Sequence, residues 1–327
     1  MAKNIPDLSI IMPVFNSENY IAETIRSLLA QSYQDFELII INDGSEDNSA
    51  DIISTFKDSR IRFFNNPTNK GIVYSRNKGL TEARGKYIAP FDADDLARKD
   101  KFEKQIQFLK KNPDFGMIGS WVLLIDKNGK QLKKKWKLNA PPNRIPSILL
   151  FRNYFAQPAV VIRREAVPLH GYVQGYDIGE DYIMWHEITE KFKTWNYPEY
   201  LIKCRIHPDS TMHREIHNMA AREKKIYETI YKAFDFKLSE QQLDLLLIIK
   251  NNMSRISPDI LQKTEDFLIN ILTRNKEIKK YDQHELMKVI YDRWLKMYLK
   301  AQPLSWKALQ KFIFSPLQLK MIGNLLP

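Results

Sequence analysis

The chain has 327 residues, with 50 Lys and Arg against 39 Asp and Glu, which gives a formal net charge of +11. Its composition, 44% hydrophobic and 27% charged, is typical of a globular protein and excludes collagen-like, coiled-coil and wholly disordered chains. The single cysteine, Cys204, excludes an internal disulfide framework and favours a reducing compartment. No apolar run approaches the roughly 20 residues that cross a bilayer, and residues 1–7 lack the apolar segment of a signal peptide. We therefore expect a cytoplasmic protein whose charge favours anionic partners.

The first 115 residues alternate between short apolar runs and segments with apolar residues at helical spacing. The expected strands are Leu8–Val14, Phe36–Ile41, Ile61–Asn65 and Tyr87–Phe91. The expected helices are Ile21–Gln31, Ala50–Phe56, Tyr74–Ala83 and Lys99–Lys110. This alternation indicates an α/β protein with a mostly parallel sheet flanked by helices. Ligands of such sheets bind beyond the carboxyl ends of the strands, where this sequence places Pro13–Asn16, Asn42–Ser45 and Asp92–Asp95.

The pattern is less regular between about residues 116 and 211. Met117–Ile125 and Gln157–Ile162 are expected strands, and Gly179–Ile188 is an expected helix that opens with the acidic pair Glu180 and Asp181. Six lysines lie within Lys127–Lys137. We expect a solvated hairpin there, with contact to a phosphorylated acceptor as the alternative.

From residue 212 the chain has no glycine until Gly323, and helical patterns dominate. The expected helices are Ile226–Phe234, Glu240–Lys250, Pro258–Arg274 and Gln283–Lys300. From Arg293 onward there are six basic residues and no acidic one, with five aromatic residues between them: Trp294, Tyr298, Trp306, Phe312 and Phe314. Bases and aromatics on amphipathic helices suit peripheral contact with an anionic membrane, and packing of the helices on the rest of the chain is the alternative.

Two acidic segments near the expected strand ends could carry chemistry. Asp92 and Asp94 form a D-x-D pattern, and clustered carboxylates suit Mg²⁺ or Mn²⁺ shared with substrate phosphates. A solvated loop that caps the next helix is the alternative. Asp43 follows the second strand, where it either accepts hydrogen bonds from a bound base or ribose or serves only to form the turn.

Two further segments are candidates with equally plain structural alternatives. Asp181 lies at a helix start, where the macrodipole favours acids, and it is also a candidate general base. His207 lies in the segment RIHPDS, and a single histidine is more often structural than a ligand. His213 and His217 are four residues apart but lack the glutamate of the HExxH zinc motif.

Taken together, these segments resemble the family 2 glycosyltransferases, which have the GT-A fold. The resemblance covers roughly residues 7–210. It includes SIIMPVFNSENY at the first strand, FELIIINDGSEDNS at the second, NKGIVYSRNKGLTEARGKYIAPFDADD up to the D-x-D, and then GEDYIMWHEI and RIHPDS. It implies a GT-A catalytic domain over 1–211, with a nucleotide-sugar half of about 1–115 and an acceptor half of about 116–211, followed by a helical domain over 212–327.

The resemblance also implies a reaction. A hexosyl or N-acetylhexosaminyl group would move, with inversion, from a nucleotide-sugar, expected to be a UDP-sugar, to a glycan or lipid-linked acceptor in cell-surface polysaccharide synthesis. Mn²⁺ or Mg²⁺ would be the cofactor. The implied roles are Asp181 as catalytic base, Asp94 as direct metal ligand beside Asp92, His207 near the metal or diphosphate, Arg76 near the donor phosphates, Asp43 at the base or ribose, and Pro13 and Phe15 lining the nucleotide pocket.

Two other functions are weighed against this one. A sugar-phosphate nucleotidylyltransferase normally has an N-terminal glycine-rich phosphate loop, but Leu8–Tyr20 contains no glycine. A non-catalytic basic binding protein with a transferase-like fold would have lost its acids, yet Asp43, Asp92, Asp94 and Asp181 are all present. No nucleic-acid-binding module is evident, so we expect no nucleic-acid partner. The expected location is cytoplasmic, with contact at the inner membrane face as an extension.

Overall fold

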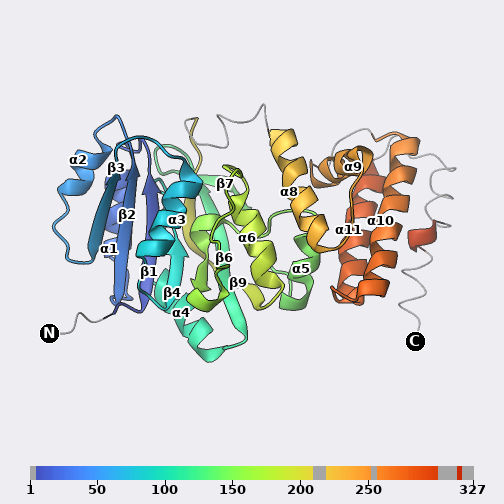
Figure 1. The fold of residues 1–327 in the computed structure, drawn as a ribbon, viewed down its shortest axis with the longest axis horizontal. Coiled ribbons are helices and arrows are strands. Elements are labelled where there is room, and N and C mark those ends of the chain that lie inside the picture. The colour runs from blue at the N-terminus through green and yellow to red at the C-terminus, as the bar shows by residue number, and fades with distance from the viewer. Residues whose placement is uncertain (1–4, 209–218, 252–255, 301–314, 319–327) are drawn as a thin grey trace. The chain divides into compact units, whose positions relative to one another are not determined.

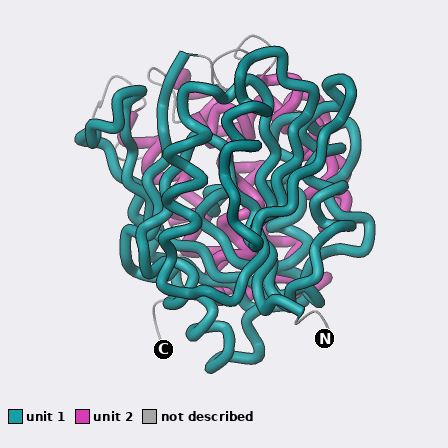
Figure 2. The backbone as a smooth tube through the Cα atoms, turned by 90° about the vertical axis from the view of Figure 1, so that its left-hand side faces the viewer, with its two compact units in different colours: residues 1–142, 154–216 teal, residues 143–153, 217–327 magenta. Residues whose placement is uncertain are grey.

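The structure is a computed structural model that describes residues 5–208, 219–251, 256–300 and 315–318 (Figure 1). The chain divides into two compact units (Figure 2). Unit 1 comprises residues 1–142 and 154–216, and unit 2 comprises residues 143–153 and 217–327. The predicted boundary between residues 211 and 212 stays a prediction.

The N-terminal half of unit 1 is a four-stranded parallel sheet with crossover helices. Its strands are β1 (Leu8–Val14), β2 (Phe36–Asp43), β3 (Ile61–Asn66) and β4 (Tyr87–Pro90), in the order β3-β2-β1-β4. The connecting helices are α1 (Ile21–Leu29), α2 (Ser49–Ser54) and α3 (Ile72–Glu82). The parallel α/β arrangement predicted from the alternating pattern is therefore confirmed for this half.

Both faces of this half are buried, as is usual for parallel sheets. Successive side chains of a strand point to opposite faces, so β1 supplies both apolar layers. On one face, Ile10 belongs to the same apolar cluster as Ile25 of α1. On the other face, Ile11 clusters with Ile39 of β2 and with Leu80 of α3.

The rest of unit 1 extends this sheet as a mixed one, with nine strands among the described residues. The added strands are β5 (Leu96–Ala97), β6 (Phe115–Ile125), β7 (Gln131–Trp136), β8 (Val161–Arg163) and β9 (Lys193–Arg205). The order continues β4-β8-β6-β9-β5, and β7 pairs with β6 as a hairpin. The main helices here are α4 (Lys101–Lys111) and α6 (Glu180–Thr189).

Strand directions bring six strand ends to one edge of the sheet, and the end of β3 at Asn66 is one of them. β4 is antiparallel to β8, β8 is antiparallel to β6, and β6 is parallel to β9, so β6 and β9 run in the direction of β1, β2 and β4. These strands end at Val14, Asp43, Pro90, Ile125 and Arg205. We call this side the carboxyl edge, and it carries the candidate site.

Unit 2 is built from helices: α5 (Ile145–Ile148), α8 (Met219–Ala233), α9 (Glu240–Asn251), α10 (Pro258–Ile278) and α11 (Gln283–Lys300). The hydroxyl of Ser257 caps α10 by accepting a hydrogen bond from the amide of Ile260. The hydroxyl of Tyr227 donates to the carbonyl of Phe151 at 2.7 Å, which fastens α8 to residues 143–153. In the described part of the chain, no helix has the length and apolar character needed to cross a bilayer.

Two sequence expectations are corrected by the fold. Gln157–Ile162 is not one strand, because Gln157–Ala159 forms a short 3₁₀ turn and the strand begins at Val161. Trp294 and Tyr298 are 1% and 6% exposed, so these two aromatics of the basic C-terminal segment face the interior of unit 2. The other aromatics expected at a membrane, Trp306, Phe312 and Phe314, lie outside the described residues, as do His213 and His217.

Candidate active site

Asp43, the last residue of β2, is buried and hydrogen-bonded where the strand meets the following turn. Its Oδ1 accepts from Asn66 Nδ2 at 2.8 Å and from the amide of Lys70 at 3.0 Å. Its Oδ2 accepts no hydrogen bond within the described residues. Gly44 has φ +69°, and a β-carbon there would lie 2.5 Å from the carbonyl carbon of Thr68, so the turn needs glycine. The carboxylate is thus fixed with one oxygen available to a ligand.

The end of β1 lies beside this turn. Pro13 is buried in the strand and pairs with Ile41 of β2. Phe15, the first residue after the strand, is half-buried. Asn16 has φ +47° and its amide donates to the hydroxyl of Ser45 at 3.0 Å, which joins the two turns. Phe15 therefore lies next to the turn that carries Asp43, as the implied nucleotide pocket requires.

Arg76 connects the D-x-D segment to the start of α6. Its guanidinium pairs with Asp92 at 3.1 Å and also with Glu180, and it lies 5.6 Å from the centroid of the Tyr172 ring. Burial of the Asp92 carboxyl raises its pKa; Arg76 opposes the shift, and the carboxylates of Asp94 and Asp181 add to it. Asp92, Asp94 and Asp181 therefore act on one another electrostatically.

Asp94 and His207 are brought together from segments more than a hundred residues apart. The Oδ2 atom of Asp94 and the Nε2 atom of His207 are 2.9 Å apart, and the Tyr20 ring packs on the imidazole with centroids 4.9 Å apart. His207 is 8% exposed, and its Nδ1 atom is buried with no hydrogen-bond partner among the described residues. One oxygen and one nitrogen ligand thus face each other.

This pair fits a divalent cation only in part. The described residues contain no group of three His, Cys, Asp or Glu side chains arranged to hold a metal ion. Mg²⁺ and similar ions usually take one or two carboxylates and complete their shell with water and substrate phosphates. The donor set therefore suits an ion held jointly with a diphosphate rather than one caged by the protein alone.

Arg205, which the sequence pattern did not indicate, holds the D-x-D segment in place through hydrogen bonds. Its Nε donates to the carbonyl of Asp94 at 2.9 Å, and its amide donates to the carboxylate of Asp95 at 2.8 Å. The guanidinium also donates to the carbonyl of Lys127 at 3.2 Å and pairs with Glu23 at 2.8 Å. One side chain thus ties the loop after β4 to α1 and to the β6–β7 hairpin.

A buried polar layer lies beneath this loop. Burial raises the pKa of the Asp95 carboxyl well above its usual range, and the neighbouring carboxylates of Asp94 and Asp92 add to the shift. Burial also raises the pKa of Cys204, which is hydrogen-bonded to Asp95, and lowers the pKa of Lys101, which has no exposed surface. The shifts of Cys204 and Lys101 favour the neutral thiol and the neutral amine, which suits a structural role under the loop.

Asp181 lies in the first turn of α6, beside the other carboxylates. The turn is set by Gly179, whose φ of +82° is left-handed and which occupies the N-cap position of the helix. The charge of Asp181 acts on both Asp92 and Tyr172. All the acids named in the sequence analysis therefore lie at the carboxyl edge.

Comparisons with known proteins agree with this geometry. Residues 9–230 match the model of the family described as Glycosyl transferase family 2. An uncharacterised glycosyltransferase of Haemophilus influenzae is 31% identical over 281 residues, which cover 83% of this chain and 85% of the relative. An O-antigen biosynthesis glycosyltransferase of Escherichia coli, WbnJ, is 32% identical over 213 residues, which cover 62% of this chain and 81% of the relative.

A solved structure shares the fold of this chain. The crystal structure of S. aureus TarS 1-349 in complex with UDP-GlcNAc superposes with a TM-score of 0.57, at 16% identity, and covers 97% of this chain and 92% of that one. The fold is thus of the GT-A kind, with a helical C-terminal region.

The chain belongs to glycosyl transferase family 2. It is a glycosyltransferase, with relatives in O-antigen and polysaccharide biosynthesis. This class replaces the two alternatives drawn from the sequence, a nucleotidylyltransferase and a non-catalytic binding protein.

Proposed function

We propose that this glycosyltransferase moves a sugar from a nucleotide-sugar to a hydroxyl of a glycan acceptor and inverts the anomeric centre. The observation that carries the proposal is the convergence of Asp43, Asp92, Asp94 and Asp181 at one edge of the sheet. UDP is the expected nucleotide, supported by the UDP-GlcNAc bound to the structurally similar S. aureus protein. The acceptor is expected to be a glycan or lipid-linked glycan of a cell-surface polysaccharide, in line with the O-antigen relative.

Asp181 is proposed as the base because a sugar hydroxyl is a weak nucleophile until its proton is removed. Its carboxylate accepts that proton while the acceptor oxygen bonds to the anomeric carbon. The bond from that carbon to the diphosphate oxygen breaks in the same step, and its electron pair leaves with the nucleotide. One displacement of this kind inverts the centre and needs no covalent enzyme intermediate.

The donor would be held by residues on both sides of the carboxyl edge. The available Oδ2 of Asp43 suits a hydrogen bond from a base N–H or a ribose hydroxyl, and the half-buried Phe15, two residues after Pro13, suits packing against the base. Arg76 already pairs with both Asp92 and Glu180. It therefore suits a role in which it keeps Asp92 in place close to the donor phosphates.

Mn²⁺ or Mg²⁺ is the proposed cofactor, with Asp94 as ligand and His207 and Asp92 beside it. When bound, such an ion would stabilise the charge that develops on the leaving diphosphate. The mutual repulsion of Asp92, Asp94 and Asp181 favours a cation at this edge.

We further propose that residues 1–211 carry the reaction and that the enzyme works on the cytoplasmic side of a membrane. Contact with an anionic inner membrane face now depends on the basic residues of the C-terminal segment. The two described aromatics of that segment are buried and do not contribute.

Nucleotide release tests the proposal. The protein is incubated with a panel of UDP- and GDP-sugars, with Mn²⁺ or with a chelator, beside the Asp94→Asn and Asp181→Asn variants. Metal-dependent release from one donor, at least about a hundredfold lower in Asp94→Asn, is the expected result. Release that is equal with chelator and in Asp94→Asn would contradict the assignment of Asp94.

A further inference from the structure

A groove in unit 1 lies outside the site just described. A cavity of about 460 Å³ lies between α1, β5 and the neighbouring strands β6 and β9. Its apolar lining comes from Leu96, Leu123, Tyr200 and Ile202, and its basic lining from Arg26, Arg98 and Lys203. The donor-binding and proton-accepting residues proposed above do not line it.

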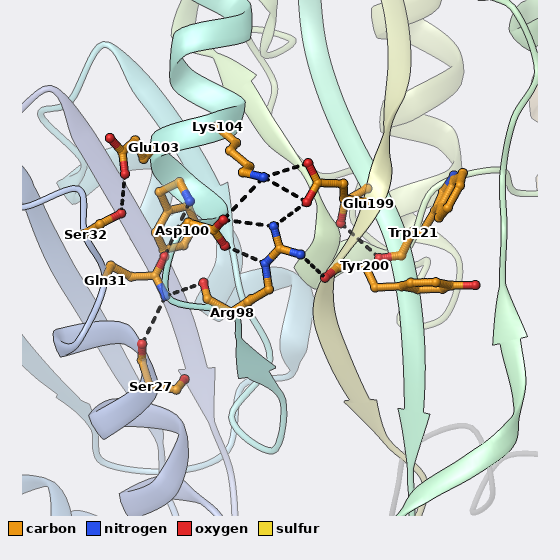
Figure 3. Close-up of polar contacts among 12 residues, drawn as sticks. Ser27, Gln31, Ser32, Arg98, Asp100, Glu103, Lys104, Trp121, Glu199 and Tyr200 are labelled. Atoms are coloured by element: carbon orange, nitrogen blue, oxygen red, sulfur yellow. Dashed lines mark hydrogen bonds and ion pairs between the residues drawn. The ribbon is translucent and has the colours of Figure 1, made fainter.

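Beside the cavity, Trp121, Lys135 and Lys137 lie on the same face of the sheet as its lining residues Leu123 and Tyr200. Trp121 of β6 and Tyr200 of β9 are cross-strand neighbours with ring centroids 5.2 Å apart (Figure 3). The ammonium of Lys137 lies 4.9 Å from the centroid of the Trp121 ring, and that of Lys135 lies 5.6 Å from the Tyr200 ring. Lys135 of β7 and Lys203 of β9 both pair with Leu123 of β6. A third ammonium group therefore lies on the side of β6 opposite Lys135.

The lysines are not neutralised by their surroundings. Arg98 and Lys104 pair with Asp100 and Glu199 in a closed cluster on one side of the groove (Figure 3). Within the described ranges, Lys135, Lys137 and Lys203 are exposed and have no acidic partner. The groove therefore carries a net positive charge that an anionic ligand would complement.

We propose that this groove binds an anionic segment of the acceptor glycan. Sugar rings would pack their C–H faces on Trp121 and Tyr200, and phosphate or carboxylate groups of the same chain would pair with Lys135, Lys137 and Lys203. The inference rests on the proposed function, since it names the chemical class of the acceptor.

The groove is coupled to the active site by one ion pair. Glu23, which lines the cavity, pairs with Arg205, and Arg205 in turn donates to the carbonyl of Asp94. Glu23 and Arg205 thus form a continuous chain of contacts from the groove to the D-x-D segment. The end of a glycan lying in the groove would be directed toward the carboxyl edge, where Asp181 and the donor would meet it.

A glycan suits this groove better than a lipid bilayer does. Proteins that insert into a bilayer surface present protruding apolar side chains. The apolar residues of the groove, Leu96, Leu123 and Tyr200, are only partly accessible and line a recess. A flat membrane cannot enter such a recess, whereas a single polymer chain can.

Binding of the full chain to a charged and a neutral glycan tests the inference without donor or metal. The probes are dextran sulfate, neutral dextran of equal length, and phosphatidylglycerol vesicles, at about 150 mM salt to screen weak contacts. The groove variant is Lys135→Gln with Lys137→Gln and Lys203→Gln. The control variant removes the same charge at exposed sites elsewhere, Lys57→Gln with Lys232→Gln and Lys276→Gln.

The wild type should bind dextran sulfate at least tenfold more tightly than neutral dextran. The groove variant should bind it about tenfold more weakly than the wild type, and the control variant less than twofold more weakly. Equal weakening in both variants would overturn the proposal, and so would binding to the vesicles alone. Nucleotide release without acceptor should be the same in both variants, so a failure of the transferase proposal would be seen separately from a failure of the groove.

Discussion

Arg205 offers a sharp test of how the D-x-D segment is held. The side chain is 7% exposed and donates to the backbone carbonyls of Asp94 and Lys127, while it pairs with Glu23. In Arg205→Met these carbonyls have no donor in a site that water reaches poorly. In Arg205→Lys the charge remains, but one nitrogen replaces a planar group that donates in three directions.

The size of the effect follows from the hydrogen bonds and the ion pair that each substitution removes. Each hydrogen bond to a backbone carbonyl is worth about 1 kcal/mol, and the charged pair adds a similar amount. We expect Arg205→Met to lower the free energy of unfolding by about 3 kcal/mol and Arg205→Lys by about half as much. Because Asp94 would then be less well placed, the Mn²⁺ concentration for half-maximal nucleotide release should rise about tenfold in Arg205→Lys. Urea unfolding and a Mn²⁺ titration measure the two effects.

Arg163 provides a matched control. It is 6% exposed, and its guanidinium donates to the carbonyls of Phe115 at 2.8 Å and Asn112 at 3.3 Å, at the opposite edge of the sheet. Arg163→Lys should therefore cost similar stability and leave the Mn²⁺ dependence unchanged. If both lysine variants shift the Mn²⁺ dependence equally, or if neither does, the positioning role of Arg205 is refuted.

Three further predictions concern the turn, the proton acceptor and the ion-pair cluster. Gly44→Ala should lower the free energy of unfolding by at least about 2 kcal/mol in urea unfolding and weaken UDP binding in calorimetry, because of its φ of +69° and the contact with Thr68. Asp181→Asn should keep donor binding in calorimetry but lower transfer to acceptor at least about a thousandfold in a product assay; near-normal transfer would remove Asp181 from the role of base. The hydrogen bond from Lys104 lowers the pKa of Glu199 below its unfolded value, so its stabilisation is complete at neutral pH and is lost as the pH falls below about 4.5. Because this carboxylate is partly exposed, Glu199→Gln should cost less than about 1 kcal/mol at pH 7 and flatten the pH dependence of urea unfolding below about pH 4.5.

The parallel half of the sheet was predictable because its strands are buried on both faces. Leu8–Val14 and Phe36–Asp43 are buried at every position, and each contains an apolar run, Ile10–Val14 and Leu38–Ile41. The crossover helices have apolar residues at helical spacing and are therefore equally visible in the sequence. The acidic turns follow these strands directly, which is why Asp43 and Asp92 could be expected at one edge.

The second half of unit 1, from β5 to β9, was harder to predict for physical reasons. β9 (Lys193–Arg205) alternates between buried and exposed positions, contains Pro198 and pairs with β6 through register shifts, so it has no apolar run to mark it. In Gln157–Ala159 a proline at the second position favours a turn before the strand begins. The contact between Asp94 and His207 spans more than a hundred residues of sequence and depends on the β6–β9 pairing, which local patterns do not encode.

The role of Arg205 and the position of Lys203 beside the lysine-rich run were missed for the same reason. In the sequence, Arg205 is one basic residue among many, and only the fold brings it to the carbonyl of Asp94. Lys135 and Lys203 are far apart in the chain but flank Leu123 on two sides of β6. The lysine-rich run Lys127–Lys137 did predict the hairpin. The contact between Lys135 and the Tyr200 ring became visible only in the structure.

The proposed function requires the carboxyl edge between Asp43 and Asp94 to bind a nucleoside diphosphate together with a divalent cation. Calorimetric titration of UDP and GDP, each with Mn²⁺ and with chelator, tests it on the wild type and on Asp43→Ala and Asp94→Asn, with Lys57→Gln as the control. We expect one nucleotide to bind with Mn²⁺ and its affinity to fall at least tenfold with chelator and in both aspartate variants. Equal affinity in all of these conditions, or no binding of either nucleotide to the wild type, would contradict the account.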